Sequence, residues 1–456
     1  MSAPTLSCVP GIDWPGLPTA AGAAMLAMQW QFEQSQWWTR DVLTARQFDQ
    51  LRLLLGHAVA NVPHYRDALR DAGLRGVADL SPETFARWPL LRKGDVMARE
   101  KHLHAAGIPQ EHGRVVTGAT SGSTGEPVRL AYSEAAQFFI HALILRSHLW
   151  HGLDLSAKFA AISSILESGT QSMWSPVAGA VFRTGPASGL NSSTDVDRQL
   201  DWLIEERPAY LQTRPTNLRA LLGRSRENGK VPPGLRAVIL DSESLPPGLH
   251  EMAQDLWNAK VLATYCCAEF GTLALQCPQH QHYHVQSESV YLEVLREDAT
   301  PCAPGEVGQV VVTTLHNFAM PLVRYVLGDY AEVGRPCACG RGLPVLNRIV
   351  GRMRNMAVDP DGRRFWPSYP AQVWLEVAPV RRVQLVQHTP AAIEILYVME
   401  RNLDPDEQRR LRANLQSVLG YPFDLTFTRV EGMERRPGDK FEDFVSRVPP
   451  GDGHRR

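Results

Sequence analysis

A short stretch rich in glycine and hydroxyl side chains constrains the fold more than any other feature of the chain. It reads Thr117-Gly118-Ala119-Thr120-Ser121-Gly122-Ser123-Thr124-Gly125-Glu126-Pro127, after a strand end at 113–116 and before a helix expected over 134–149. Glycine lets the backbone approach a ligand closely, and successive N–H groups in such a loop form a concave anion site. A Walker A loop would have lysine after Gly125, and a flexible Gly/Ser linker would repeat with low complexity. The sequence therefore predicts a phosphate-binding loop of another kind.

Length, charge and cysteine usage exclude several classes of protein. With 456 residues the chain can bury a large core and is expected to hold two or more domains. A formal net charge of −1 shows no excess of positive charge that would favour binding to nucleic acid or to an anionic membrane. The first thirty residues lack a signal-peptide pattern, and no apolar run approaches the roughly 18 residues that span a bilayer. Seven cysteines, an odd number, fit a reducing compartment. We therefore expect a cytoplasmic protein without nucleic-acid or membrane partners.

The middle of the chain alternates helical patterns with short strand-like segments. These segments cover 159–165, 178–182, 210–212 and 237–240. Such alternation predicts βαβ units and a parallel sheet flanked by helices. Ser242 and Glu243 follow the last of these strands directly. Because ligands bind outside the carboxyl ends of parallel strands, they are candidates for a binding loop.

The last third of the chain predicts a β-hairpin region and then a smaller domain. Residues 293–314 alternate apolar and polar side chains around a Pro-Gly turn at 304–305, which indicates a hairpin. After Gly351 the pattern changes to strands at 383–386, 393–398 and 425–429 with a helix over 404–419. We therefore expect a core domain of residues 1–350 and a C-terminal α+β domain of residues 351–456.

The glycine-rich stretch carries a family resemblance. Residues 120–127 resemble the phosphate loop of the adenylate-forming superfamily, which includes acyl-CoA synthetases, peptide-synthetase adenylation domains and luciferases. Within it the chain most resembles the phenylacetate–coenzyme A ligase branch, from about Gln47 to about Arg447, including segments 47–73 and 88–95. The resemblance implies an α/β core with parallel sheets flanked by helices, a β-hairpin region, and a small mobile C-terminal lid.

The resemblance also implies a set of nucleotide-binding residues. Asp329, in the segment Pro321-Leu322-Val323-Arg324-Tyr325-Val326-Leu327-Gly328-Asp329, would accept both ribose hydroxyls. Ser242 and Glu243 would pass beside the adenine, and Arg352, in the core-to-lid hinge motif, would contact ribose or phosphate. Lys440 would reach the carboxylate and α-phosphate during adenylation as a catalytic residue. The loop residues that would hold the phosphates are Thr120, Ser121, Gly122, Ser123, Thr124 and Gly125.

A second motif, Tyr265-Cys266-Cys267-Ala268-Glu269, follows a strand expected over 260–264. Tyr265 can stack on adenine, and the resemblance makes Glu269 the carboxylate that holds Mg²⁺ against the triphosphate and serves catalysis. The family has glycine at position 266 and a hydroxyl residue at position 268, so the substrate pocket departs from its pattern. We expect the two cysteines to be buried small apolar residues rather than reactive thiols.

Four residues form a candidate metal site. The positions of Cys277, His284, Cys337 and Cys339 resemble those that bind zinc in some family members, and such a site would be structural. The Cys-x-Cys spacing at 337–339 is less usual than Cys-x-x-Cys, and His280 and His282 are alternative ligands.

These motifs together predict an ATP-dependent acid-activating ligase that forms an acyl-adenylate, releases pyrophosphate and transfers the acyl group to coenzyme A. The expected cofactors are ATP, Mg²⁺ and coenzyme A, with a structural Zn²⁺, and the partner is a small-molecule acid. The hinge residues Arg354 and Asn355 replace an Asp-Asp pair of the family, which weakens the expectation of lid rotation. An alternative is transfer of an unusual small acid to an amine or carrier protein. Another is a nucleotide binder without catalysis, against which Glu269, Asp329 and Lys440 argue. The sequence leaves the oligomeric state open, with a homodimer as one option.

Overall fold

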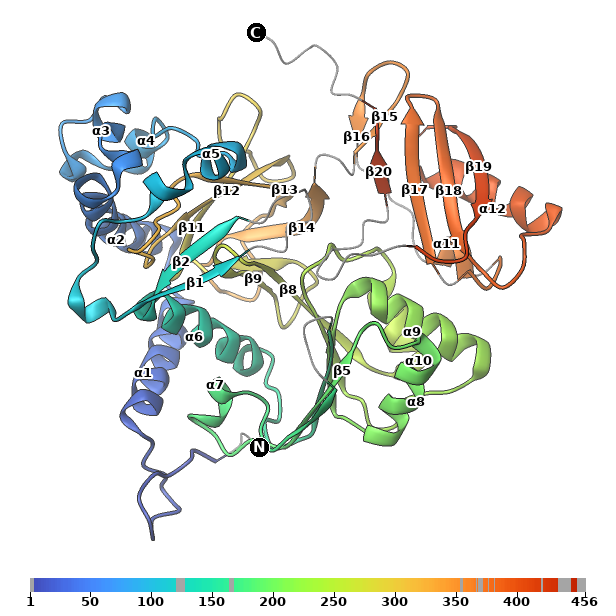
Figure 1. Ribbon diagram of the computed structural model, residues 1–456, viewed down its shortest axis with the longest axis horizontal. Coiled ribbons are helices and arrows are strands. Elements are labelled where there is room, and N and C mark those ends of the chain that lie inside the picture. Colours follow the sequence, from blue (N-terminus) through green and yellow to red (C-terminus); the bar gives the residue numbers. More distant parts are fainter. Residues whose placement is uncertain are drawn as a thin grey trace. The chain divides into compact units, whose positions relative to one another are not determined.

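The computed structural model describes residues 4–119, 128–163, 168–352, 356–365, 367, 372–375, 377–380, 382–419, 421–433 and 444–448. The chain forms two compact units, each built from three segments (Figure 1). The first unit comprises Met1–Ser156, Ser172–Gly185 and Thr264–Ile349. The second comprises Ala157–Gln171, Pro186–Ala263 and Val350–Arg456. The expected division into residues 1–350 and 351–456 stays a prediction.

The helices of the first unit begin with a long N-terminal pair. The unit contains α1 (Ala20–Ser35), α2 (Arg40–Asn61), η1 (Pro63–Tyr65), α3 (Ala68–Asp71), η2 (Val77–Asp79), α4 (Pro82–Phe85), α5 (Lys93–Leu103), η3 (Gln110–His112), α6 (Glu134–Trp150) and α7 (Pro176–Gly179). Helix α2 buries the stripe of Leu51, Leu54 and Leu55 and ends before Pro63, because proline disfavours helical geometry in the residue before it. The expectation of a strand at 178–182 was wrong, since Ser175 caps Ala178 and Pro176 starts α7.

A two-stranded hairpin flanks the predicted phosphate loop. It consists of β1 (Val115–Ala119) and β2 (Arg129–Ser133), which pair antiparallel from Val115↔Ser133 to Ala119↔Arg129. Helix α6 follows at once, and its N-cap residue Ser133 accepts a hydrogen bond from the Ala136 N–H at 3.2 Å. The strand–loop–helix context expected from the sequence is therefore present on both sides of the loop.

The large sheet of the first unit has the order β11-β12-β13-β14-β10-β9-β8. Its strands are β8 (Lys260–Cys267), β9 (Gly271–Gln276), β10 (Tyr283–Val285), β11 (Val290–Leu295), β12 (Val307–Thr314), β13 (Tyr325–Val333) and β14 (Val345–Arg352). β11 and β12 pair antiparallel, which confirms the predicted hairpin region.

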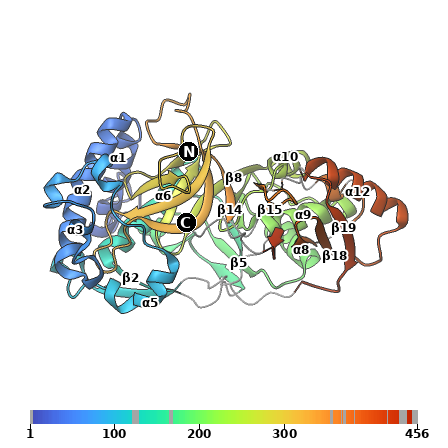
Figure 2. The ribbon, with the colours of Figure 1, turned by 90° about the horizontal axis from the view of Figure 1, so that it is seen from above.

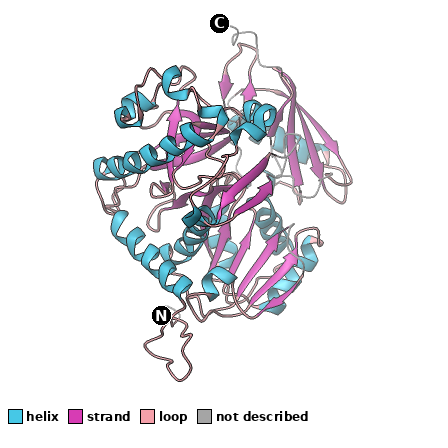
Figure 3. Cartoon of the chain, turned by 60° about the vertical axis from the view of Figure 1, so that its left-hand side comes forward, coloured by secondary structure: helices cyan, strands magenta, loops and turns pink. Residues whose placement is uncertain are grey.

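In the second unit the strand order continues as β8-β7-β6-β3-β5-β4. Here β3 (Phe159–Ser163), β5 (Ala187–Asn191), β6 (Tyr210–Thr213), β7 (Ala237–Leu240) and the start of β8 run parallel, and β4 (Gly169–Gln171) is an antiparallel edge. Helices α8 (Val196–Glu206), α9 (Pro215–Asn228) and α10 (Leu249–Trp257) contribute Leu203, Leu222 and Trp257 to one buried core with these strands. The predicted α/β class with a parallel sheet and flanking helices is confirmed (Figure 3).

The C-terminal part of the second unit is a separate α+β layer. A four-stranded sheet has the order β19-β18-β17-β20, and α12 lies against it (Figures 1 and 2). The elements are β15 (Ala357–Val358), β16 (Arg364–Phe365), α11 (Gln372–Leu375), β17 (Arg382–Thr389), β18 (Ala392–Val398), α12 (Pro405–Val418), β19 (Asp424–Arg429) and β20 (Phe444–Ser446). All three strands and the helix predicted for this region are confirmed. None of the described helices is long and apolar enough to cross a membrane.

Candidate active site

Part of the predicted site lies outside the described residues. This applies to the catalytic candidate Lys440, to the hinge residues Arg354 and Asn355, and to the phosphate-loop residues Thr120, Ser121, Gly122, Ser123, Thr124 and Gly125. The hairpin of β1 and β2 sets the two ends of that loop side by side, since Ala119 and Arg129 are paired.

The first unit brings two predicted nucleotide contacts together. Tyr265, near the end of β8, donates its hydroxyl hydrogen to Asp329 Oδ2 of β13 at 2.9 Å. Tyr265 is 8% exposed, so its ring presents a defined face rather than a mobile one. A ring that can stack on a base thus lies beside a carboxylate that can accept ribose hydroxyls.

The turn between β8 and β9 carries Glu269, the predicted magnesium ligand. Glu269 is half-buried, and within the described part of the chain its carboxylate has no hydrogen bond or ion pair. Mg²⁺ is commonly bound through one or two carboxylates together with substrate phosphates, so a single acid fits that role.

Tyr132 holds this turn in place and was missed from the sequence. It belongs to β2, and its hydroxyl donates a hydrogen bond to the carbonyl oxygen of Ala268, the residue before Glu269. Burial, together with Cys267 and Glu269, raises the pKa of Tyr132, so the phenol stays protonated and remains a donor. The strand that follows the phosphate loop is therefore tied to the turn that carries the magnesium candidate.

In the second unit, Glu243 is tied to the start of α9. Glu243 Oε2 accepts hydrogen bonds from Thr216 N at 3.1 Å and from Thr216 Oγ1 at 2.7 Å. A carboxylate is favoured at a helix N-terminus because the first N–H groups have no partner within the helix. Ser242 has φ 68° and donates to Asp241 Oδ1 at 2.7 Å, which fixes the loop after β7. Contact of Ser242 and Glu243 with adenine stays a prediction.

The expected hinge lies at the end of β14. Gly351 has φ 113°, a conformation that residues with a side chain rarely adopt. A Cβ at this position would lie 3.4 Å from Ser244 Oγ, so the hinge passes close to the loop after β7. Arg352 follows within β14, and its contact with the nucleotide stays a prediction.

The four predicted metal ligands converge. The ligand atoms of Cys277, His284, Cys337 and Cys339 all lie within 4.8 Å of one another. Cys339 Sγ is 3.4 Å from His284 Nε2, and the sulfurs of Cys277 and Cys337 are 3.9 Å apart. Zn–S bonds of about 2.3 Å and Zn–N bonds of about 2.0 Å in a tetrahedron place ligand atoms roughly 3.5 Å apart, so the donor set fits zinc. Burial lowers the pKa of His284 to about 4, which leaves a neutral imidazole.

The turn that carries two of these thiols is fastened to the end of α1. Arg341 Nε donates to Gln36 Oε1 at 2.8 Å, and its guanidinium lies over the rings of Trp37 and Trp150 at 4.7 and 4.3 Å. Gly342 N donates to Gln36 O at 2.9 Å, and a Cβ at Gly342 would collide with a backbone oxygen. The cluster therefore joins the N-terminal helices to the large sheet.

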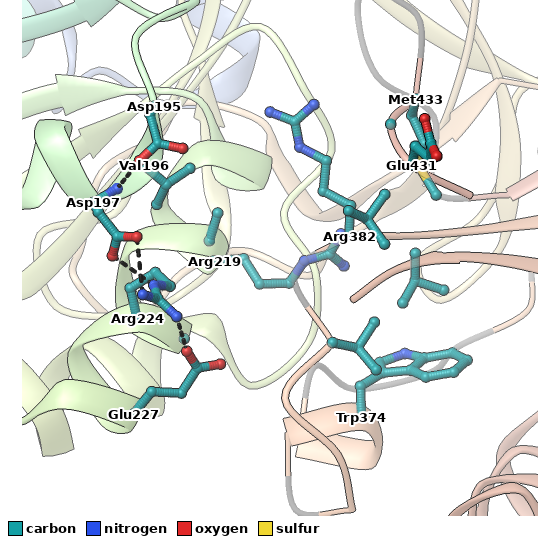
Figure 4. Close-up of a pocket in the computed structure, with 16 residues that line it drawn as sticks. Asp195, Val196, Asp197, Arg219, Arg224, Glu227, Trp374, Arg382, Glu431 and Met433 are labelled. Carbon is teal, nitrogen blue, oxygen red and sulfur yellow. Dashed lines mark hydrogen bonds and ion pairs between the residues drawn. The ribbon is translucent and has the colours of Figure 1, made fainter. Parts of the chain in front are cut away.

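A cavity of about 220 Å³ in the second unit contains none of the predicted nucleotide residues (Figure 4). On one side α9 contributes Arg224, which pairs with Asp197 of α8 at 2.6 and 2.9 Å and with Glu227 of α9. On the other side lie Trp374, Arg382 and neighbouring residues of the C-terminal layer. Because no residue that lines this cavity is a predicted nucleotide contact, the cavity gives no evidence on the place of the ATP site.

Comparison with known proteins identifies the relatives of the chain. No family model matches it. A phenylacetate–coenzyme A ligase of Thermus thermophilus is 26% identical over 333 residues, covering 70% of this chain and 72% of that protein. One of Escherichia coli K12 is 24% identical over 329 residues, covering 70% and 73%. The chain is phenylacetate–coenzyme A ligase-like.

Solved structures show the fold of this phenylacetate–coenzyme A ligase-like chain. A 2-hydroxyisobutyryl-CoA ligase in the postadenylation state matches with a TM-score of 0.70 at 18% identity, covering 88% of this chain and 89% of that one. An anthranilate CoA ligase in complex with anthranoyl-AMP matches with a TM-score of 0.52 at 15% identity, covering 71% and 65%. The fold is that of the adenylate-forming ligases.

The two cysteines that depart from the family motif lie on β8. Cys266 pairs with Thr272 and Cys267 with Gly271, across a bulge in the ladder of β8 and β9. Burial, reinforced by Glu269, raises the pKa of the Cys267 thiol well above its usual value, so little nucleophilic thiolate forms. This supports the expectation that Cys267 is not a reactive thiol, but the expectation that both cysteines are buried was wrong, because both are half-buried.

Proposed function

We propose that the protein activates a carboxylic acid with ATP and transfers the acyl group to coenzyme A. A carboxylate oxygen of the acid attacks the α-phosphorus, the bond to the β-phosphate oxygen breaks, and pyrophosphate leaves with the bonding electrons. The thiol sulfur of coenzyme A then attacks the acyl carbonyl carbon of the adenylate, and AMP leaves. The observation that carries the proposal is the pairing of Tyr265 with Asp329 in a chain of this fold.

The protein contributes mainly position and charge stabilisation to the first step. Asp329 orients the ribose and Tyr265 the base, while the loop of residues 120–125 holds the phosphates and Arg352 adds a cation. Bound Mg²⁺ would neutralise charge on the phosphate oxygens, and Glu269 is the residue that would hold it. Lys440 stabilises charge between the acid and the α-phosphate.

We also propose that Cys277, His284, Cys337 and Cys339 hold a structural Zn²⁺. Four nitrogen and sulfur ligands leave no open position for substrate, which is the arrangement of structural sites. His280 and His282 stack at 5.1 Å beside the cluster but are not part of it. A cytoplasmic location and a homodimer remain predictions.

A second acceptor is the alternative to coenzyme A. Cys266 and Ala268 alter the motif beside the acid, and Arg354 and Asn355 replace the acidic hinge pair. These departures favour an unusual small acid passed to an amine or a carrier protein. Product formation that does not depend on coenzyme A would support this alternative.

The test is ATP–pyrophosphate exchange over a panel of aryl, aliphatic, amino and small inorganic acids. Coenzyme A is then added to the acid that exchanges best, and thioester is measured. Exchange followed by thioester is the expected result. Exchange without thioester contradicts the coenzyme A step, and absence of exchange with every acid, despite ATP binding, favours a nucleotide binder without catalysis.

Lys440→Ala tests the catalytic assignment within the same assay. We expect the exchange rate to fall on the order of 10²- to 10³-fold, as it does when one stabilising donor is removed from a transition state. Arg435→Ala, in the same basic segment, is the matched control and should retain the parent rate. A Lys440→Ala variant as active as the parent would remove Lys440 from the mechanism.

A further inference from the structure

One buried amide joins two segments of the C-terminal layer that are far apart in the sequence. Gln387 lies on β17 and is fully buried. Its Oε1 accepts hydrogen bonds from Val358 N and from Ser446 Oγ, both at 3.0 Å. Its Nε2 donates to Val358 O at 2.5 Å and to Pro390 O at 3.5 Å. The amide therefore uses both its donor and its acceptor capacity.

Each of the two main partners of Gln387 follows a predicted site residue at the same distance in the sequence. Val358 lies six residues after Arg352 of the hinge, and Ser446 lies six residues after Lys440. Six residues of chain span at most about 20 Å. The amide thus sits where the chain that leaves the hinge meets the chain that returns from the Lys440 segment.

The strands joined by Gln387 are too short to be stable alone. β15 has two residues and β20 has three, and isolated strands of this length are not stable in water. β20 pairs in parallel with β17 through Gln387↔Ser446, and Arg447 N donates to Gln387 O at 2.8 Å. The hairpin of β15 and β16 has its own turn at Asp359, whose Oδ1 accepts from Asp361 N and Arg363 N at 3.1 and 2.9 Å.

We propose that Gln387 is a positioning residue that holds two described elements in one fixed relation: β20, which follows Lys440 in the sequence, and the hairpin of β15 and β16, which follows the hinge. Removing the amide leaves the N–H and carbonyl of Val358 and the hydroxyl of Ser446 without their buried partner, which weakens both attachments at once. The apolar core of the layer, with Leu385, Leu411 and Leu415, remains to hold the rest together. The catalytic part of this proposal rests on the proposed function, and the structural part does not.

Hydrogen–deuterium exchange of the full-length Gln387→Met variant tests the structural part. We expect amide exchange to rise at least tenfold in both 357–365 and 444–448, with α12 unchanged. Gln416→Met is the matched control, because Gln416 Nε2 donates to Phe423 O within the same layer, at 3.2 Å, and among the described residues it joins neither of the two segments. A rise in one of the two segments alone, or in neither, would overturn the proposal.

A milder variant tests the same coupling if Gln387→Met does not fold. Ser446→Ala removes the hydrogen bond to Gln387 and a local one from Val448 N at 3.4 Å, and it does not touch the hairpin of β15 and β16 directly. We expect faster exchange in that hairpin nonetheless, since its partner Gln387 is shared. Unchanged exchange in 357–365, with the rise confined to 444–448, would show that the two segments are independent.

Pyrophosphate exchange tests the catalytic part. In Gln387→Met we expect kcat to fall on the order of ten- to a hundredfold with KM for ATP unchanged, because misplacement of a catalytic group affects the transition state. In a Lys440→Ala background the same substitution should not lower kcat any further. An equal loss in both backgrounds would overturn the positioning role. Failure of the parent to catalyse exchange would contradict the proposed function and leave the hydrogen-exchange result standing.

Discussion

At the scale of single residues, the buried ion pair of Arg324 and Glu293 shows how one side chain organises the first unit. Arg324 is 1% exposed, and its Nε and Nη2 donate to Glu293 at 3.0 Å each. Its Nη1 also donates to the carbonyl oxygens of Ala86 and Trp88 at 2.5 and 2.6 Å. All three nitrogens of the guanidinium donate to protein acceptors, so Arg324 acts in folding and not in contact with substrate.

Glu293→Gln should destabilise the fold by about 3 kcal/mol, because breaking a buried pair leaves an uncompensated charge. Urea denaturation followed by tryptophan fluorescence measures the change. Arg70→Gln removes the exposed pair with Asp67 and should leave the denaturation midpoint unchanged. Equal effects of the two substitutions would show that burial does not strengthen the Arg324 pair.

His148 of α6 gives a prediction for acid stability. Burial lowers its pKa to about 4, while the unfolded chain titrates near 6.5. Below pH 6.5 the unfolded state therefore binds more protons than the native state, and stability falls as the pH drops from 6.5 towards 4. The loss for this residue is about 3 kcal/mol. His148→Leu should flatten the decline in urea midpoint over this range, whereas His141→Leu, at an exposed position of α6, should keep it.

The sequence predicted some residue roles well and could not predict others. Tyr265 and Asp329 belong to motifs that carry the family resemblance, and the structure joins them. Tyr132 lies outside those motifs, and its partner is a backbone carbonyl 136 residues away, which no side-chain pattern signals. Roles that depend on long-range backbone contacts need the fold.

At the scale of elements, the predictions that succeeded were those for helices and strands with a clear pattern in their own sequence. The helical pattern of α12 and the β-rich run of β7 appear directly in the sequence and were correct. The segment 178–182 is apolar enough for a strand, but Ser175 and Pro176 start a helical turn before it. Helix α1 was not predicted, because its exposed positions include alanines and Trp30 with a single charged residue, Glu33, and give no clear periodic pattern.

The proposed zinc site of Cys277, His284, Cys337 and Cys339 is the element that most needs a direct test. Cys339→Ser should lose the metal and lower the melting temperature by several degrees, since binding energy at a structural site is folding energy. Metal content by mass spectrometry should be one zinc per chain in the parent and close to zero in the variant. Cys8→Ser, at an exposed free cysteine, should change neither quantity. A parent without zinc, and with the same melting temperature in chelator, would contradict the proposed site.

At the scale of the whole molecule, we expect the two proposed half-reactions to depend on the junction at Gly351. The chain crosses from the first unit to the second at residues 349–350, directly before this glycine. Ligases of this kind are expected to reorient a lid between adenylation and thioester formation, and hinge residues absorb the change in φ and ψ. The sequence predicted the hinge from its motif, but the loss of its acidic pair left its behaviour open.

Gly351→Ala should change the ratio of the exchange rate to the thioester rate. At φ 113° alanine is strained, which disfavours the orientation of the junction seen here relative to orientations with negative φ. About 1.4 kcal/mol of strain would shift the ratio on the order of tenfold. Gly305→Ala, at φ 91° in an open turn with no atom near its Cβ, carries a similar backbone penalty away from the junction and should leave the ratio unchanged. If Gly351→Ala slows both half-reactions by the same factor, residue 351 supports the fold without acting as a hinge.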